Sequence, residues 1–549
     1  MQATTPLPRR MALLGLFALA LLILPRQAPS SDASTTRARP DRATSLGTGR
    51  LDAPGGEPVF VRGALDVTIE APTSLAFGPD GRLYVAALTE IRALTLDPST
   101  QEVLAVEQIA SGLEDVTGIA FDPTAAPSPV TVYASRREPG ATAGFDSRVS
   151  TFTAPTWERD DVITGLPTSR PFFNHLTNGL AFDSAGRLFI AQGSSTDAGL
   201  ADGTYWPETP LSAAVLIAPI HDPGFDGAIT YDPPGSPADD TVDQVGGDVS
   251  VYAAGLRNPY DLVVHTNGSI YATDNGPAEL AVSISCTQSA LRGNAADELN
   301  LVEPGNYYGH PNRNRGRSDP RQCAYRAPQE GDGTDFTGPI AVLPPHCSCD
   351  GLAEYTAAAF GSAMQGDLIY AQWSFGALAR AQLSSDGRSV LATSVLASGL
   401  GQPLDVTVGP SGTIYVAEHK AGRVSYLAPD SDRDGCADGR ELEAPAELGG
   451  GRDPKDFWDF FDTPDPSATP PRDGSVTADD VFRVAARFGA TGDPTIDPLS
   501  TPASTGYHPA YDRTPAPPGG SPLAIGPPDG AIAMPDVFAV AAQFGHRCV

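Results

Sequence analysis

One short pattern recurs along the chain and constrains its fold more than any other feature. An alternating apolar strand is followed by a turn of Pro, Asp or Gly and then by a second alternating strand. The copies begin at Leu75 (LAFGPDGRLYVAA), Gly118, Gly179, Asp261 and Asp405, and a degenerate copy surrounds Gly366. Each copy predicts a β-hairpin, because such turn residues supply the backbone angles that tight turns need. Six hairpins with no helical periodicity between them predict an all-β, six-bladed β-propeller over residues 59–428.

The composition agrees with this fold and limits the partners. The chain contains 57 Gly and 53 Pro, which is typical of many short strands joined by turns. Its net charge of −30 argues against nucleic acid or an anionic membrane as a partner, because phosphate groups require a basic surface. We therefore expect a soluble extracellular protein that holds divalent cations.

The N-terminal region predicts export. Arg9 and Arg10 precede an apolar run from Met11 to Leu24, which is short for a membrane span but matches the core of a signal peptide. We predict a signal peptide over residues 1–29, with an uncleaved membrane anchor as the alternative. Residues 30–58 have little to bury and are predicted to be a disordered linker. The expected location is secreted, extracellular or at the cell surface.

The six cysteines of an exported chain are candidates for disulfide bonds. Four of them lie in one region and two lie in the tail: Cys286, Cys323, Cys347 and Cys349, then Cys436 and Cys548. Pairing within each region is the simplest interpretation, and the sequence leaves the connectivity open. The spacings lack the paired CxxC pattern of a zinc site.

After the propeller, residues 429–549 predict a small α-helical calcium-loop domain. Two homologous segments, DGSVTADDVFRVAARFG and DGAIAMPDVFAVAAQFG, predict helices over Asp479–Phe488 and Asp536–Phe544. Both helices place apolar residues on one face. We expect the two faces to be buried against each other.

The loop that opens this tail has the ligand spacing of an EF-hand. Carboxylates fall at positions 1, 3, 5, 9 and 12 of the twelve residues, and Gly at position 6 permits the sharp turn. The predicted ligands are Asp430, Asp432, Asp434, the carbonyl of Cys436 at position 7, Asp438 and Glu441. We predict that calcium binds here and rigidifies the joint between propeller and tail. The alternative is a solvated acidic linker, since long flanking helices are missing.

The two helical segments carry weaker versions of the same loop. Positions 5 and 12 are acidic in both copies: Asp473 and Asp480 in the first, Asp529 and Asp536 in the second. Asp462 and Asp512 lie upstream and could complete the two sites. This duplicated loop and helix resembles a dockerin, which implies two calcium ions and a cohesin-like or cell-surface partner. A helical spacer without a partner is the alternative.

Three segments inside the propeller carry a further resemblance. They are FFNHLTNGLAFDSAGRLFIAQGS, which contains His175; GLRNPYDLVV with the following ATDNGPAE; and ADELNLVEPGNYYGHPN. In order and spacing they resemble the glucose/sorbosone dehydrogenase family. That resemblance implies a six-bladed propeller that oxidises an aldose or related sugar with pyrroloquinoline quinone (PQQ) and calcium.

The resemblance also implies roles for individual residues. His175 would be the general base that removes the hydroxyl proton of the sugar while hydride passes to the quinone, a task that suits imidazole because its ordinary pKa lies near neutrality. Arg257 and Asn258 would contact the cofactor. The carbonyls of Gly276 and Pro277 would hold a catalytic calcium ion.

The chain departs from this family at the positions of its cofactor-binding cations. Ser374, Phe375, Gln402 and Leu404 stand where the family has a lysine and arginines. A trianionic quinone is bound less well without such cations. The alternative is therefore a non-catalytic propeller that binds glycan or protein, fixed to an extracellular assembly by its tail.

Overall fold

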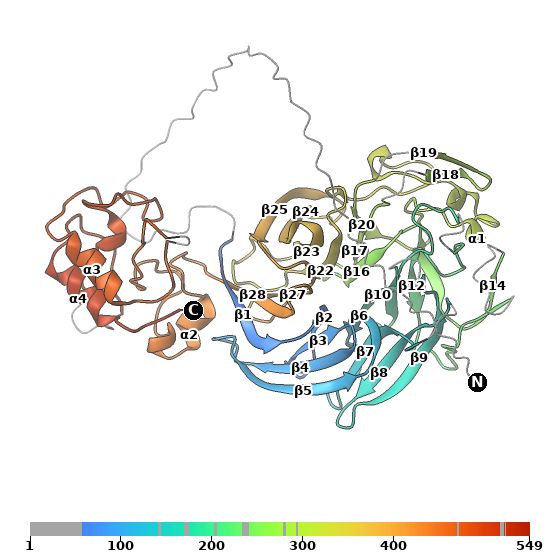
Figure 1. Ribbon diagram of the computed structural model, residues 1–549, viewed down its shortest axis with the longest axis horizontal. Helices are drawn as coiled ribbons and strands as arrows, with labels where there is room; N and C mark the ends of the chain where they lie inside the picture. The colour runs from blue at the N-terminus through green and yellow to red at the C-terminus, as the bar shows by residue number, and fades with distance from the viewer. Residues whose placement is uncertain are drawn as a thin grey trace, which may run out of the picture. The chain divides into compact units, whose positions relative to one another are not determined.

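The chain folds into a six-bladed β-propeller followed by a small lobe with short helices (Figure 1). The computed structural model describes residues 58–548, apart from 141–143, 170–174, 202–205, 233–240, 278–280, 292–294, 469–470, 517–520 and 522. The predicted signal peptide and nearly all of the predicted linker lie outside the described residues. In the part that is described, no helix has the length and hydrophobicity needed to cross a membrane.

Each blade is a four-stranded antiparallel sheet, and this confirms the predicted six-bladed propeller. The first two blades contain β2 (Pro72–Phe77), β3 (Leu83–Ala87), β4 (Glu90–Leu96) and β5 (Val103–Ser111), then β6 (Glu114–Ala120), β7 (Thr131–Arg137), β8 (Ser147–Thr153) and β9 (Glu158–Leu166). The next two contain β10 (Thr177–Phe182), β11 (Leu188–Gln192), β12 (Ala214–Ala218) and β15 (Ser250–Ala254), then β16 (Pro259–Val264), β17 (Ile270–Asp274), β20 (Glu298–Val302) and β21 (Ala341–Val342). The fifth contains β22 (Cys349–Glu354), β23 (Leu368–Gln372), β24 (Ala377–Leu383) and β25 (Val390–Ser398).

The sixth blade closes the ring by joining both ends of the propeller. It contains β26 (Pro403–Val408), β27 (Ile414–Glu418), β28 (Arg423–Pro429) and, on its outer edge, β1 (Phe60–Thr68). Phe60 pairs with Pro429, and the amide of Asp430 extends the ladder by donating to the carbonyl of Val59 at 3.0 Å. Because β1 comes before the first blade and β28 ends the last, their pairing closes the ring.

The recurring hairpin forms the two inner strands of every blade, as the first one illustrates. The β2–β3 turn closes through the amide of Gly78, which donates to the carbonyl of Arg82 at 2.9 Å. Gly81 in this turn has a φ of +79°, which glycine adopts without steric cost. The residues of β3 are all buried, since both faces of the sheet pack against neighbouring blades. The innermost strands β2, β6, β10, β16, β22 and β26 contact one another in sequence around the axis.

The third and fourth blades contain insertions between their strands. These insertions contain the two-stranded sheets of β13 (Thr230–Asp232) with β14 (Asp243–Gly246) and of β18 (Ala281–Ser285) with β19 (Gln288–Leu291), and the helix α1 (Arg313–Gly316). Short 3-10 turns lie at η1 (Pro320–Cys323), η2 (Pro328–Glu330) and η3 (Trp373–Phe375). Two disulfides lie in the propeller region, Cys286–Cys323 and Cys347–Cys349.

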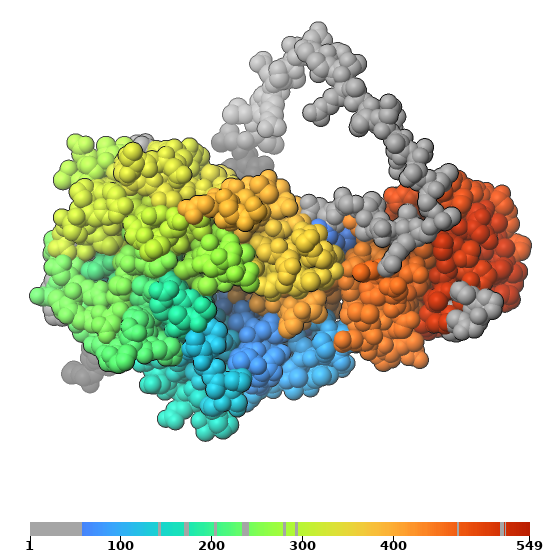
Figure 2. Space-filling model, turned by 180° about the vertical axis from the view of Figure 1, so that it is seen from behind, coloured from blue at the N-terminus to red at the C-terminus, as the bar shows by residue number. Residues whose placement is uncertain are grey.

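The residues after β28 form a lobe drawn in orange and red in Figure 2. Its elements are α2 (Asp438–Glu443), η4 (Ala446–Leu448), α3 (Ala478–Ala486), η5 (Pro509–Tyr511) and α4 (Met534–Ala542). The Cys436–Cys548 disulfide links the start of the lobe to its end. All three disulfides therefore pair within the propeller or within the tail, as the spacing suggested.

The packing of the tail helices differs from the prediction. Val484 of α3 and Val540 of α4 are buried in the core of the lobe. The phenylalanines face solvent instead: Phe482 and Phe488 are 67% and 58% exposed, and Phe538 and Phe544 are 66% and 62% exposed. The two helices contact each other and share this core with Phe460, Phe461 and Tyr511, so the predicted burial of their apolar faces is confirmed for the valines and wrong for the phenylalanines.

Candidate functional site

A cavity of about 630 Å³ lies where strand ends from all six blades converge. Its described lining residues include Thr73, Leu88, Thr117, His175, Leu176, Arg257, Asn258, Tyr260, Asn275, Gly276, Asp297, His346, Ser348, Asp350, Trp373, Ser374, Leu404 and His419. Most of them sit at the ends of inner strands, so the propeller fold itself brings them together. We call this cavity the central pocket. It contains four of the predicted residues, His175, Arg257, Asn258 and Gly276.

His175 is buried, and its hydrogen bonds define its tautomer. Nδ1 lies 2.8 Å from the hydroxyl oxygen of Ser194, and that hydroxyl donates to the carbonyl of Thr196 at 2.5 Å. Since the single hydroxyl proton is used toward Thr196, Ser194 accepts from Nδ1–H and the lone pair of the ring is on Nε2. Burial, and then the nearby charge of Arg257, lower the pKa of His175 well below 6.5. The ring is therefore uncharged at neutral pH.

Arg257 and Asn258 are held rigidly at the start of β16. Their backbone amides donate to the two carboxylate oxygens of Asp274, at 2.8 and 2.7 Å. The guanidinium of Arg257 donates to the carbonyls of Asp197 and Asn275, at 2.8 and 2.9 Å, and also pairs with the Asp197 carboxylate. The charge of Arg257 is thus largely neutralised inside the protein.

The segment after β17 offers oxygen ligands to a cation. The amide of Gly276 donates to Asp297 at 2.9 Å, and the carbonyl of Pro277 accepts from Ala295 at 3.2 Å. Side-chain Oδ1 of Asn275 is buried and has no hydrogen-bond partner among the described residues. Sequence reasoning missed Asn275, although it directly precedes the predicted Gly276 and Pro277. These oxygens suit a hard cation such as calcium.

A constrained loop forms the wall of the pocket next to this segment. The Cys347–Cys349 disulfide spans it, and the residues on either side of Cys347 have positive φ, 55° at His346 and 44° at Ser348. Ser348 and Asn275 both donate to the carboxylate of Asp350, at 3.0 and 2.9 Å. Burial raises the pKa of Asp350 to about 8. No sequence signal identified Asp350, because only the fold brings it to the pocket.

PQQ carries three carboxylates, and the pocket does not fit them. The one guanidinium among the described lining residues is that of Arg257, which is already paired with Asp197. Ser374 and Leu404 line the pocket where cations were expected. With no further cation among the described lining residues to balance three carboxylates, a trianion would be bound weakly here. The oxygen ligands fit a divalent cation better than they fit the cofactor.

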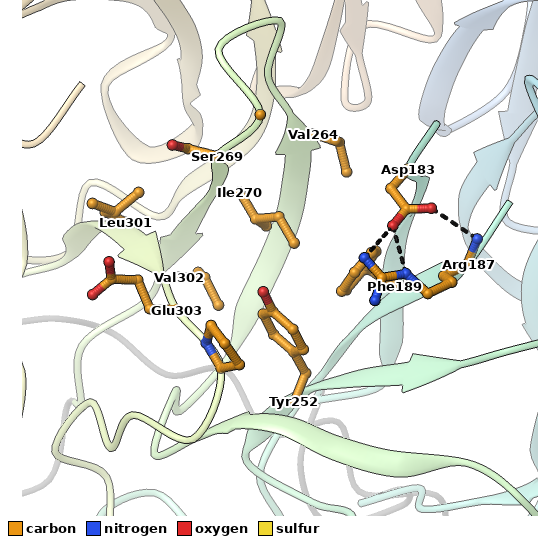
Figure 3. A pocket seen from close by; sticks show the side chains of 12 residues that line it. Asp183, Arg187, Phe189, Tyr252, Val264, Ser269, Ile270, Leu301, Val302 and Glu303 are labelled. Carbon is orange, nitrogen blue, oxygen red and sulfur yellow. Dashed lines mark hydrogen bonds and ion pairs between the residues drawn. The ribbon is translucent and has the colours of Figure 1, made fainter. Parts of the chain in front are cut away.

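A second, smaller cavity of about 230 Å³ lies between the third and fourth blades (Figure 3). Arg187 pairs there with Asp183 at 2.6 Å, and the ring of Tyr252 packs edge-on against Phe189. None of the predicted site residues lines this cavity. Its walls are largely the ends of blade strands, so it is a gap between blades rather than a reactive site.

In the tail, the structure gathers some of the predicted carboxylates and separates others. One atom each of Asp430, Asp432 and Asp434 lie within 4.8 Å of one another, and the same holds for Asp434, Glu441 and Asp459. Asp459 was not predicted, because it lies outside the twelve-residue loop. Asp438 lies apart from both groups, and its two oxygens accept from the amide and hydroxyl of Ser431 at 2.7 and 2.6 Å.

The carboxylates of the two repeats are engaged by backbone amides. Asp480 and Asp536 lie in the first turns of α3 and α4 and accept from the amides of Thr477 and Ala533, both at 2.7 Å. Asp473 and Asp529 accept from the amides two residues further on, both at 3.0 Å. The upstream residues Asp462 and Asp512 accept from Gly474 and Gly530, at 2.7 and 2.8 Å. In the described residues these carboxylates form no cluster of three.

Comparison with known proteins supplies relatives for the propeller. A family model described as Glucose / Sorbosone dehydrogenase matches residues 69–426, which is more than half of the chain. Quinoprotein glucose dehydrogenase B of Acinetobacter calcoaceticus is 23% identical over 274 residues, which cover 44% of this chain and 51% of that protein. The chain thus spans about half the length of this curated relative.

Solved structures also resemble the chain. The PQQ-bound aldose sugar dehydrogenase of Streptomyces coelicolor has a TM-score of 0.46 and 20% identity, covering 68% of this chain and 99% of that one. The apo soluble aldose sugar dehydrogenase of Escherichia coli has a TM-score of 0.47 and 18% identity, covering 67% and 99%.

Proposed function

The chain belongs to the glucose/sorbosone dehydrogenase family, and from this membership we propose that it is a sugar oxidoreductase whose active site is the central pocket. The observation that carries the proposal is the state of His175. Its ring is neutral and is oriented by Ser194, and the residue lines a cavity large enough for a sugar. A positioned neutral imidazole is suited to accept the proton of a sugar hydroxyl.

Other residues of the pocket support the same chemistry. Asn258 offers an amide group that can hydrogen-bond a sugar hydroxyl, and the face of Trp373 suits the apolar face of a sugar ring. Asn258 is fixed because its Oδ1 accepts from Asn178 at 3.1 Å. A preorganised donor and acceptor set of this kind orients a substrate toward the base.

We further propose calcium as the cation of this pocket. Asn275 Oδ1 and the carbonyls of Gly276 and Pro277 would hold it, next to the carboxylate of Asp297. A bound divalent cation would stabilise negative charge that develops on an oxygen of the substrate or acceptor. His175 would accept the proton of the sugar hydroxyl. PQQ is the first electron acceptor to be tested.

A second function is favoured by one specific observation, the scarcity of free positive charge in the pocket. A non-catalytic propeller that binds a glycan would need Asn258 and Trp373 but no cofactor-binding cations. In that case the tail would fix the propeller to an extracellular assembly. The two candidates differ in a single measurable property, the binding of a redox cofactor.

Reconstitution of the purified protein distinguishes them. Calorimetry would measure the binding of PQQ in the presence of calcium, and dye reduction would follow oxidation of a panel of aldoses. Activity that disappears in His175→Gln but persists in His221→Gln would support the oxidoreductase, since the side chain of His221 is half exposed and pairs with Asp122 away from the pocket. Sugar binding without cofactor binding or activity would support the second candidate and overturn the first.

A further inference from the structure

We propose that the tail holds one calcium ion in a site that the EF-hand-type loop does not complete by itself. The carboxylates that hold it are those of Asp430, Asp432, Asp434, Glu441 and, from a separate segment, Asp459. The carbonyl of Cys436 is a further candidate ligand, because position 7 of such a loop supplies a backbone oxygen. This ion would be structural, and it is independent of the chemistry of the central pocket.

The loop is folded as a cation-binding loop would be. The carboxylate of Asp430 accepts from the amides of Arg433 and Gly435, at 2.7 and 3.2 Å. Gly435 has a φ of +97°, a conformation that other residues rarely adopt. Asp434 accepts from the amide of Cys436 at 2.7 Å. These bonds use one oxygen of Asp434 and turn the other toward the neighbouring carboxylates.

Several oxygens in this cluster are buried and have no donor. Both oxygens of Glu441 lack a hydrogen-bond partner among the described residues, although its side chain is 0% exposed. Oδ2 of Asp432, Oδ2 of Asp434 and Oδ1 of Asp459 are likewise buried and unpartnered. Leaving a charged oxygen buried without a partner is costly, whereas a cation would satisfy all five oxygens at once.

The charge balance also requires a cation. The carboxyl groups of Asp430, Asp432, Asp434, Glu441 and Asp459 are all buried and lie close together. Among the described residues, the guanidinium groups of Arg452, Arg472 and Arg513 act on Asp459, Asp430 and Asp434. Five carboxyl groups therefore outnumber three guanidinium groups. An all-oxygen set with an acidic residue able to bind through both oxygens favours calcium over zinc.

Asp459 makes the site a connection between distant parts of the lobe. Its other oxygen, Oδ2, accepts from the amide of Asp453 at 2.7 Å, and its carbonyl accepts from Gln543 at 2.7 Å. Gln543 follows α4 and also accepts from the amide of Phe461 at 3.0 Å. An ion bound by Asp459 and Glu441 would therefore tie the loop to the aromatic core and to the end of α4.

Terbium luminescence can test the location of the ion. Tb³⁺ prefers the same oxygen ligands as calcium, and Trp458 precedes Asp459 directly, so excitation of Trp458 should sensitise an ion in this site. We expect the luminescence of the full chain to be displaced by calcium and to be largely lost in Trp458→Phe. The Trp373→Phe variant is the control, because Trp373 lines the central pocket. A signal that depends on Trp373 and not on Trp458 would overturn the proposal.

Thermal unfolding of Asp459→Asn tests the role of the new ligand. Without metal, removal of one of five clustered charges relieves repulsion, so the variant should melt at a higher temperature than the wild type in EDTA. With calcium, the variant should melt at a lower temperature than the wild type. It should also bind calcium about 10- to 100-fold more weakly, which is the usual cost of losing a group that supports a metal site. Asp473→Asn is the matched control, because Asp473 is exposed. Among the bonds described, its carboxylate accepts from the amide of Ser475, two residues further on.

A reversal of the order of melting temperatures between EDTA and calcium would support the site. If Asp459→Asn melts below the wild type by the same amount in both conditions, Asp459 has only a structural role and the proposal fails. If this variant does not fold, Glu441→Gln provides the same comparison, since both oxygens of Glu441 belong to the cluster. Wild-type protein whose melting is unaffected by EDTA and calcium would also overturn the proposal.

Discussion

The imidazole Nδ1 of His175 lies 2.8 Å from the hydroxyl oxygen of Ser194. His175 precedes β10 and Ser194 follows β11, so this hydrogen bond joins the start and the end of the inner hairpin of the third blade. It orients the imidazole that we propose as the base, and Ser194 is not among the described residues that line the central pocket. Under that proposal Ser194 is a positioning residue, because it fixes the ring through the nitrogen that does not react.

Ser194→Ala should lower kcat by about 10-fold or more while His175→Gln lowers it by about 100- to 10,000-fold, the usual contribution of a general base. Loss of the hydroxyl frees the ring to rotate and to populate the other tautomer. The pH dependence of kcat/KM provides the second readout. Since burial and Arg257 lower the pKa of His175 well below 6.5, protonation should reduce the rate only below that pH. An acid limb centred at pH 6.5 or above would contradict this assignment.

Gly276→Ala should damage the central pocket. A Cβ at this position would lie 2.3 Å from the carbonyl oxygen of Ala296, so the backbone must shift, at a cost of about 1–3 kcal/mol. That shift would displace the Gly276 carbonyl, and activity should fall together with stability. Gly439→Ala is the control, because its Cβ would meet the nearest atom at 3.6 Å and should be tolerated. Calorimetric melting of both variants checks the difference.

Asp261→Asn should stabilise the protein at neutral pH. Asp261 and Asp405 lie together on the inner strands β16 and β26, and burial raises the pKa of Asp405 to about 6 and that of Asp261 well above its ordinary value. Raised carboxyl pKa values mean that the folded state holds protons which the unfolded state releases, so stability falls as pH rises from about 4 to above the folded pKa values. The variant should gain on the order of 1 kcal/mol at pH 7 and little at pH 4. Denaturant unfolding at both pH values tests this; equal effects at both would contradict it.

The three disulfides should contribute unequally. Cys436–Cys548 closes a sequence separation of 112 residues, whereas Cys347–Cys349 closes a separation of 2. Because the entropic gain grows with the closed loop, replacing the first pair by serine should cost about 2–5 kcal/mol, and replacing the second pair should cost much less in global stability. Equilibrium unfolding of the two double variants compares them directly. A larger loss for the short loop would show that another contribution dominates.

Serine at both Phe482 and Phe538 should leave the tail folded. These side chains are 67% and 66% exposed, so substitution should change the stability by no more than about 0.5 kcal/mol. The double variant Val484→Ser, Val540→Ser is the matched comparison. Both valines are fully buried, so their replacement should lower the stability several times more. Thermal melting followed by circular dichroism compares the loss of stability in the two double variants. Equal losses would restore the expectation of a fully buried apolar face.

The propeller could be predicted from sequence because its information is local. Each hairpin contains its own alternation and its own turn, so the copy at Leu75 predicts a blade without knowledge of the others. The outer strand of the sixth blade is β1, which pairs with β28 from the other end of the propeller sequence. No local sequence pattern predicts this pairing. The helix segments of the tail were predicted for the same local reason, whereas the direction of Phe482 was not, since it depends on which residues fill the core.

The site residues divide in the same way. His175, Arg257, Asn258 and Gly276 lie in motifs, and the pocket brings them together. Asn275 directly precedes the predicted Gly276 and Pro277. However, only the structure shows that its Oδ1 is buried without a hydrogen-bond partner among the described residues. Asp350 and Asp459 come from segments without a motif, and only the three-dimensional structure reveals their neighbours.

The pairing of β1 with β28 has a consequence for biosynthesis. During translation, Phe60 leaves the ribosome long before Pro429, so β1 must wait without its partner while five blades are made. The ring can be sealed only when the last blade has emerged, and the next residue, Asp430, both extends that seam to Val59 and opens the acidic loop. Because Glu441 and Asp459 leave the ribosome after Pro429, the calcium site proposed for the lobe can be completed only after the strand that seals the ring has been made.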